Sequence, residues 1–181
     1  MKKIMIVLAA VALAVSAQAA AFSWKTSATG KIYEAGTTTL LASGSAYLFD
    51  SSAVSQQAVL DAVLGGAGIE SLTALSTASV ASGAIATTEF NWGTAGDTLT
   101  AYMVVINGDE LFISGTASKL ADASATQGLQ FNAKSASQAV AMESTSFSGA
   151  GWYSAAAVPE PTSGLLMLVG LAGLALRRRR A

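Results

Sequence analysis

The chain has 181 residues, of which 52% are hydrophobic and only 12% charged, and its formal net charge is −1. It contains no cysteine and no histidine, which excludes disulfides, thiol nucleophiles, imidazole bases and the zinc sites built on these side chains. A chain of this length is expected to form one domain.

The first 19 residues have the three parts of a secretory signal peptide. Two lysines precede an apolar run over residues 4–15, and Ala17 and Ala19 then form a cleavage site of the A-x-A type. The apolar run is too short to span a membrane comfortably. We therefore expect signal peptidase to cut after Ala19, with Ala21 as the second choice.

Residues 20–157 are predicted to form the exported domain. Alanine, serine, threonine and glycine dominate this part, which favours short strands and turns. The expected fold is mainly β or α+β, a small antiparallel sheet or sandwich with one or two short helices. The strand candidates outside the central hairpin are residues 30–33, 45–49, 84–92 and 129–132.

One helix is predicted after Ser52, which is placed to cap its first turn. Gly65 and Gly66 are expected to end it. Its apolar patch consists of Val59, Leu60, Val63 and Leu64. A second short helix is suggested by Ile69, Leu72 and Leu75.

A hairpin over residues 98–114 is the clearest expected element. Its first strand carries apolar side chains in both alternating sets, which predicts a central strand buried on both faces. The residues Asn107, Gly108 and Asp109 then form a strong reverse-turn signal before a second apolar stretch. The following segment, 116–126, is rich in Ala, Ser and Thr and is expected to be a loop.

The last 24 residues, 158–181, are predicted to lie outside the folded domain. Pro159 and Pro161 enclose Glu160 and interrupt regular structure, so the tripeptide is expected to form an accessible hinge. The nearly uncharged run 162–176 would give a helix of roughly 22 Å against a hydrocarbon core of about 30 Å, a marginal membrane anchor. Four basic residues after it favour a cytoplasmic carboxyl terminus. They are Arg177, Arg178, Arg179 and Arg180.

This order of motif, hydrophobic helix and basic tail resembles the PEP-CTERM sorting domain of Gram-negative bacteria. The resemblance implies recognition by an exosortase-like membrane enzyme, with Pro159, Glu160 and Pro161 as substrate residues. It further implies delivery to the cell surface or extracellular matrix after transient anchoring in the inner membrane. A linker before an ordinary membrane anchor is the alternative.

The exported part is acidic. Residues 20–158 hold four lysines against ten acidic residues, a net charge of −6. Nucleic acid is therefore not expected as a partner, since binding its phosphates needs clustered Lys and Arg.

Several functional interpretations of this part compete. The acids Asp97, Asp109 and Glu110 are candidate calcium ligands or, as preferred, turn residues. A catalytic carboxylate pair for glycoside hydrolysis is the weakest hypothesis. The aromatic residues are either sugar-stacking platforms or, as preferred, core; they are Trp24, Trp92, Trp152, Tyr33, Tyr47, Tyr102 and Tyr153.

These observations predict an exported structural or interaction protein with no catalytic residue, metal site or cofactor. Its expected partners are signal peptidase, an exosortase-like enzyme and the membrane, with extracellular polysaccharide as a further candidate. The alternatives are a polysaccharide- or calcium-binding surface module and a permanently membrane-tethered periplasmic domain.

Overall fold

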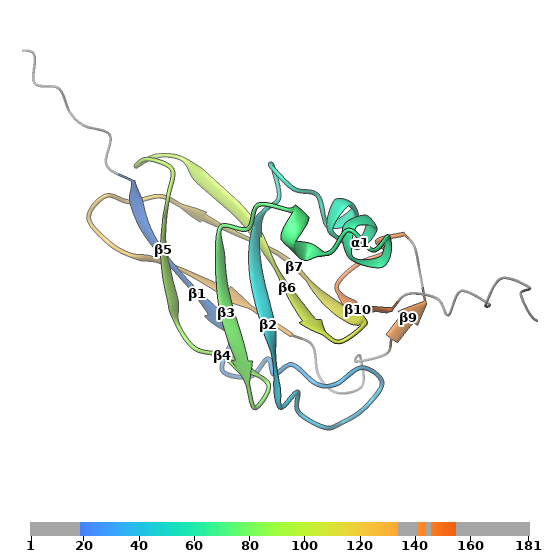
Figure 1. Ribbon diagram of the computed structural model, residues 1–181. Coiled ribbons are helices and arrows are strands. Elements are labelled where there is room, and N and C mark those ends of the chain that lie inside the picture. Colours follow the sequence, from blue (N-terminus) through green and yellow to red (C-terminus); the bar gives the residue numbers. More distant parts are fainter. Residues whose placement is uncertain (1–18, 134–140, 144–145, 155–181) are drawn as a thin grey trace, which may run out of the picture.

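The computed structural model describes residues 19–133, 141–143 and 146–154. Within these residues the strands form two sheets, one of three strands and one of seven, that pack face to face (Figure 1). A helical layer covers part of the outer face of the larger sheet. The predicted signal and anchor helices lie outside the described residues. No helix within them is long and apolar enough to cross a membrane.

The larger sheet has the strand order β4-β3-β2-β6-β7-β10-β9. Neighbouring strands are antiparallel except β10 and β9, which pair in parallel. The strands are β2 (Ser43–Asp50), β3 (Ser76–Ala81), β4 (Ala84–Ile85), β6 (Thr98–Asn107), β7 (Glu110–Leu120), β9 (Ala141–Glu143) and β10 (Gly151–Ser154).

The smaller sheet has the order β5-β1-β8, with β1 spanning Ala20–Thr26, β5 Thr88–Trp92 and β8 Gln127–Phe131. Phe22 and Trp24 alternate with exposed or half-buried residues along β1, so their side chains share the face that meets the larger sheet. Trp24 also donates an indole hydrogen bond of 3.0 Å to Ser76 Oγ on β3, which joins the two sheets.

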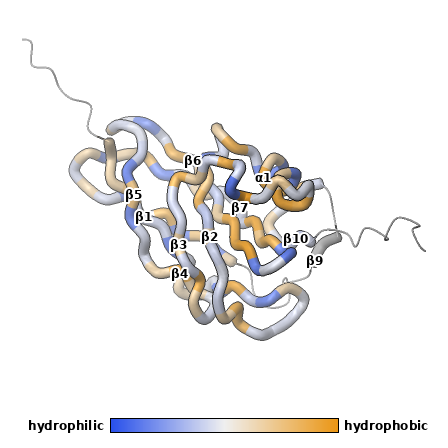
Figure 2. Tube along the Cα trace, viewed as in Figure 1, coloured by the Kyte–Doolittle hydropathy of each residue, from blue (hydrophilic) through white to orange (hydrophobic). Residues whose placement is uncertain are grey.

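Strand β6 has the two buried faces that its sequence predicts. Its residues Leu99, Ala101, Met103 and Val105 belong to the core between the sheets. Tyr102 and Val104 belong to a second core on the opposite face. The strongest hydrophobic colour in Figure 2 accordingly follows β6, the first half of β7 and the helix.

The second core is closed by helix α1 (Gln56–Leu64) and the short 3-10 helix η1 (Ile69–Ser71). Val59, Leu60 and Ile69 pack from these helices onto Phe49 and Tyr153 of the sheet. The result is three layers in which the larger sheet lies between the smaller sheet and the helices.

Helix α1 begins later than its sequence predicts. The Asp50 carboxylate accepts hydrogen bonds from the backbone N–H and hydroxyl of Ser52, at 2.8 and 2.6 Å, and this holds a turn there. The cap is Ser55, whose hydroxyl accepts from the N–H of Ala58 at 3.1 Å. The predicted end of the helix at Gly65 is confirmed.

The second helix is shorter than expected, since only Ile69–Ser71 is helical and the chain is extended at Leu72.

The strand predictions at 45–49 and 129–132 are confirmed by β2 and β8. The prediction at 30–33 is wrong, because that segment has only one isolated bridge, between Tyr33 and Leu40. The segment 84–92 is divided between β4 and β5, which belong to different sheets.

The loop predicted over 116–126 is wrong in its first part, because β7 continues to Leu120. Residues Ala117 and Lys119 pair there with Ala101 and Leu99 of β6. The antiparallel expectation holds for most pairs, but β1 with β8 and β10 with β9 are parallel.

Candidate functional site

A groove of about 450 Å³ lies on the outer face of the larger sheet, where the helical layer ends. This volume is within the range of roughly 300–1,000 Å³ that is usual for ligand sites. The groove is formed by β2, β3 and the first turn of η1. It is lined by Ser45, Ala46, Tyr47, Glu70, Thr77, Ala78 and Ser79.

The register of β2 and β3 brings the polar side chains of the groove together. Tyr47 lies directly opposite Thr77, and Ser45 lies directly opposite Ser79. Because alternate residues of a strand share one face, all four side chains project to the same side of the sheet. Thr77 and Ser79 are exposed, as is Ser45, while Tyr47 is half-buried.

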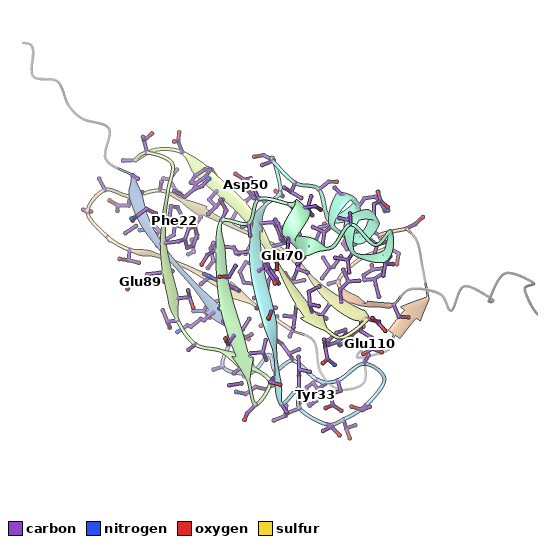
Figure 3. All side chains as sticks on the ribbon, viewed as in Figure 1. Phe22, Tyr33, Asp50, Glu70, Glu89 and Glu110 are labelled. Atoms are coloured by element: carbon purple, nitrogen blue, oxygen red, sulfur yellow. The ribbon has the colours of Figure 1, made fainter. Side chains whose placement is uncertain are left out.

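Glu70 forms the wall of the groove on the helical side. It follows the buried Ile69 in η1 and is itself exposed, beside β2 in Figure 3. Its Oε1 accepts a hydrogen bond of 3.0 Å from the Tyr47 hydroxyl. The pKa of Tyr47 is raised by partial burial and by this carboxylate, so the phenol keeps its proton and remains a donor.

The ring of Tyr47 is the outermost of three stacked aromatic rings. It stacks on Phe49 with ring centroids 6.5 Å apart, and Phe49 stacks on Tyr102 at 5.8 Å. Phe49 and Tyr102 are fully buried under the helical layer. The row therefore leads from the second core to the groove and restricts the orientation of Tyr47.

A smaller hollow of about 240 Å³ lies at the carboxyl end of α1. It is lined by Leu60, Asp61, Leu64 and Gly65. Asp61 already binds Gln57 Nε2 at 2.7 Å, and the other lining side chains carry no polar group. The hollow thus offers little chemistry for recognising a ligand.

Most of the aromatic residues singled out in the sequence belong to the core, as preferred. Trp24 and Trp152 are 0% and 1% exposed, and Tyr102 and Tyr153 are 0% exposed. Trp92 is half-buried and makes an edge contact with Phe22 at 5.9 Å. The four fully buried side chains are not available as surface platforms for a sugar.

The remaining two tyrosines are half-buried. Tyr33 packs against the core between the sheets, whereas Tyr47 lines the groove. Sequence reasoning therefore included one groove residue, Tyr47, but it missed Glu70, Thr77 and the paired serines.

Of the three acidic residues near the hairpin, Asp97 holds a turn and Glu110 lies in the β-ladder. The Asp97 carboxylate accepts hydrogen bonds from the N–H and hydroxyl of Thr94 at 2.8 and 2.9 Å, and these bonds lower its pKa. Glu110 pairs with Asn107 across the turn that contains Asp109. Among the described residues, no group of three Asp, Glu, His or Cys side chains is placed to hold a metal ion.

The predicted processing residues fall almost wholly outside the described part of the chain. Ala17, the 159–161 tripeptide and the 177–180 arginines all lie there. Ala19 is described and exposed, and the next residue, Ala20, is buried as the first residue of β1. A cut after Ala19 would leave β1 intact, whereas a cut after Ala21 would remove the residue that pairs with Trp92.

The carboxyl end of the described chain is held firmly in the larger sheet. Ser154, the last residue of β10, pairs with Glu110 of β7 on one side and with Glu143 of β9 on the other. The side chains of Trp152 and Tyr153 enter the two different cores.

Comparison with known families identifies the segment that follows. Residues 157–180 match the PEP-CTERM protein-sorting motif. This confirms the resemblance drawn from the proline-flanked glutamate, the apolar run and the arginines. A motif of this kind marks an exported protein that an exosortase processes at the membrane. No curated protein and no solved structure matches the chain.

Proposed function

We propose that the chain is an exported protein of the cell envelope or extracellular matrix, sorted by an exosortase-type enzyme, with a structural or interaction role and no catalytic activity. The observation that carries the proposal is the sorting motif at residues 157–180, directly behind a folded β-sandwich. The sandwich is the cargo, and the segment 158–181 is its address.

The spacing between fold and motif supports processing close to the sandwich. Strand β10 is paired on both sides as far as Ser154, and Pro159 follows five residues later. Five residues of extended chain span at most about 18 Å. A cut at the motif would therefore leave only a short tail after β10.

The contacts of three acidic residues support a non-catalytic role. Asp50 and Asp122 accept hydrogen bonds from Ser52 and Ser124, in each case from a residue two positions along the chain. Asp97 accepts hydrogen bonds from Thr94, three positions before it. These carboxylates stabilise turns, which accounts for them without a reaction.

Mass spectrometry of both termini of the protein isolated from its native host tests the proposal. The expected mature chain begins at Ala20 and has lost Arg177–Arg180. As a control, a variant with Pro159, Glu160 and Pro161 all replaced by alanine should keep its arginines. A wild-type chain that still carries the four arginines would contradict sorting and indicate a membrane-tethered domain.

A further inference from the structure

We infer that the groove beside Tyr47 and Glu70 binds a neutral, hydroxyl-rich chain, namely a segment of an uncharged polysaccharide. The inference concerns the folded domain alone, so it does not depend on how the protein is sorted. It is carried by the chemistry of the seven lining residues and by their arrangement on the sheet.

The charge of the groove selects against anionic ligands. Among the residues that line it, Glu70 is charged and there is no lysine or arginine to pair with a phosphate, sulfate or uronate. The exported part around it carries a net charge of −6, from four lysines and ten acidic residues. An anion entering the groove would meet the Glu70 carboxylate without a compensating cation.

The polarity of the groove selects against apolar ligands. Three aliphatic hydroxyls and one phenol line it, from Ser45, Thr77, Ser79 and Tyr47. Hydroxyls both donate and accept hydrogen bonds. They pair best with groups that also both donate and accept hydrogen bonds, and sugar hydroxyls do so.

Tyr47 and Glu70 are arranged in advance for a sugar. An aromatic ring can pack against the apolar C–H face of a pyranose, while a carboxylate accepts strong hydrogen bonds from its hydroxyls. One Glu70 oxygen accepts from Tyr47 at 3.0 Å, and a carboxylate has further lone pairs for a ligand. Because Phe49 backs the ring of Tyr47, little ordering is left to be done on binding.

The direction of the groove suits a linear chain. Its hydroxyls come in two cross-strand pairs, Tyr47 with Thr77 and Ser45 with Ser79, that succeed each other along β2 and β3. Residues on one face of a strand repeat about every 6.6 Å, twice the rise of one residue. A polysaccharide segment lying along the strands would meet hydroxyl groups at this interval.

Affinity electrophoresis of the purified full chain in mild detergent tests the inference. Native gels would contain dextran, galactomannan, xyloglucan or arabinoxylan as neutral polymers, and polygalacturonate as the anionic one. We expect at least one neutral polymer to retard the protein and polygalacturonate not to. Glu70→Gln and Tyr47→Ala should each raise the dissociation constant for that polymer about tenfold, the cost of one strong hydrogen bond or one aromatic contact.

Two control variants test whether the loss of binding is specific to the groove. Glu89→Gln removes an exposed carboxylate on β5 of the smaller sheet, and Tyr33→Phe removes a phenol outside the groove; both residues are labelled in Figure 3, away from Glu70. These variants should bind like the wild type. Circular dichroism of every variant checks that it is folded.

Three results would overturn the inference. They are retardation by none of the neutral polymers, retardation by polygalacturonate as strong as by any neutral polymer, and neutral-polymer binding that the Glu70 and Tyr47 variants leave unchanged. None of them bears on sorting, which the termini of the native protein report separately.

Discussion

Replacing Trp152 with alanine should be among the most destabilising single substitutions in the domain. The indole is 1% exposed and packs against Phe112 with ring centroids 5.7 Å apart, in the core between the sheets. Removing a buried tryptophan costs about 3–5 kcal/mol, since the lost apolar contacts are joined by a cavity. A domain of this size typically has only about 5–15 kcal/mol of stability in total.

Thermal unfolding of the full chain, followed by far-ultraviolet circular dichroism, measures this loss. The midpoint of Trp152→Ala should fall by roughly 10–25 °C. Trp92→Ala is the matched control, because that indole is half-buried at the edge of the smaller sheet and should cost about half as much. If Trp152→Ala cost no more than Trp92→Ala, the buried position of Trp152 and the pairing of β10 would both be refuted.

Three further predictions concern single polar groups. Tyr153→Phe removes a hydroxyl that three backbone groups bind, and should lower the free energy of unfolding by about 2–3 kcal/mol in a urea titration. Ser55→Ala should lower the free energy of unfolding by about 1 kcal/mol and speed hydrogen exchange of the Ala58 amide, because it removes the helix cap. Ser52→Ala should leave exchange of that amide unchanged. The opposite pattern would show that Ser52 is the cap. Burial raises the pKa of the Tyr102 phenol, so the unfolded chain loses the phenol proton at a lower pH than the folded chain does. The free energy of unfolding should therefore be unchanged by this group below pH about 10 and should fall above it. A Tyr102→Phe variant whose stability falls equally steeply above pH about 10 would contradict the burial of this phenol.

The sequence predicted best those elements whose own side chains carry a strong pattern. Strand β6 has apolar residues in both alternating sets, and its turn contains Gly108, which adopts a φ of 60° that other residues disfavour. Strand β1 was missed although Phe22, Trp24 and Thr26 alternate along it. The strand is short, and it begins directly after the predicted cleavage site at Ala19.

Other strands are specified by their neighbours rather than by their own residues. The second half of β7 is rich in small polar residues. The strand nevertheless continues there, because its backbone pairs with residues Ala101 to Thr98 of β6. In β3 only Val80 is fully buried, so the hydrophobic pattern is too weak to find. The Ser82-Gly83 pair that follows β3 is a local sequence signal for the hairpin of β3 and β4. In the structure both residues of this turn have positive φ.

The groove was beyond reach of local patterns. Tyr47, Glu70 and Thr77 are separated by 23 and 7 residues and come from three different elements. Only the register of β2 on β3 and the position of η1 bring them to one place. The composition nevertheless predicted that the domain around the groove is acidic.

The way β10 is built into the fold determines how the domain responds to mechanical load. Any pull applied at the carboxyl end of the chain enters the sandwich through Ser154, along the axis of a strand that is hydrogen-bonded on both sides. Such a load acts in shear, so the ladders to β7 and β9 must fail together rather than one bond at a time. Extraction would also withdraw Trp152 and Tyr153 from two separate cores at once. A load that enters the domain at Ser154 is therefore resisted by two ladders and two cores together.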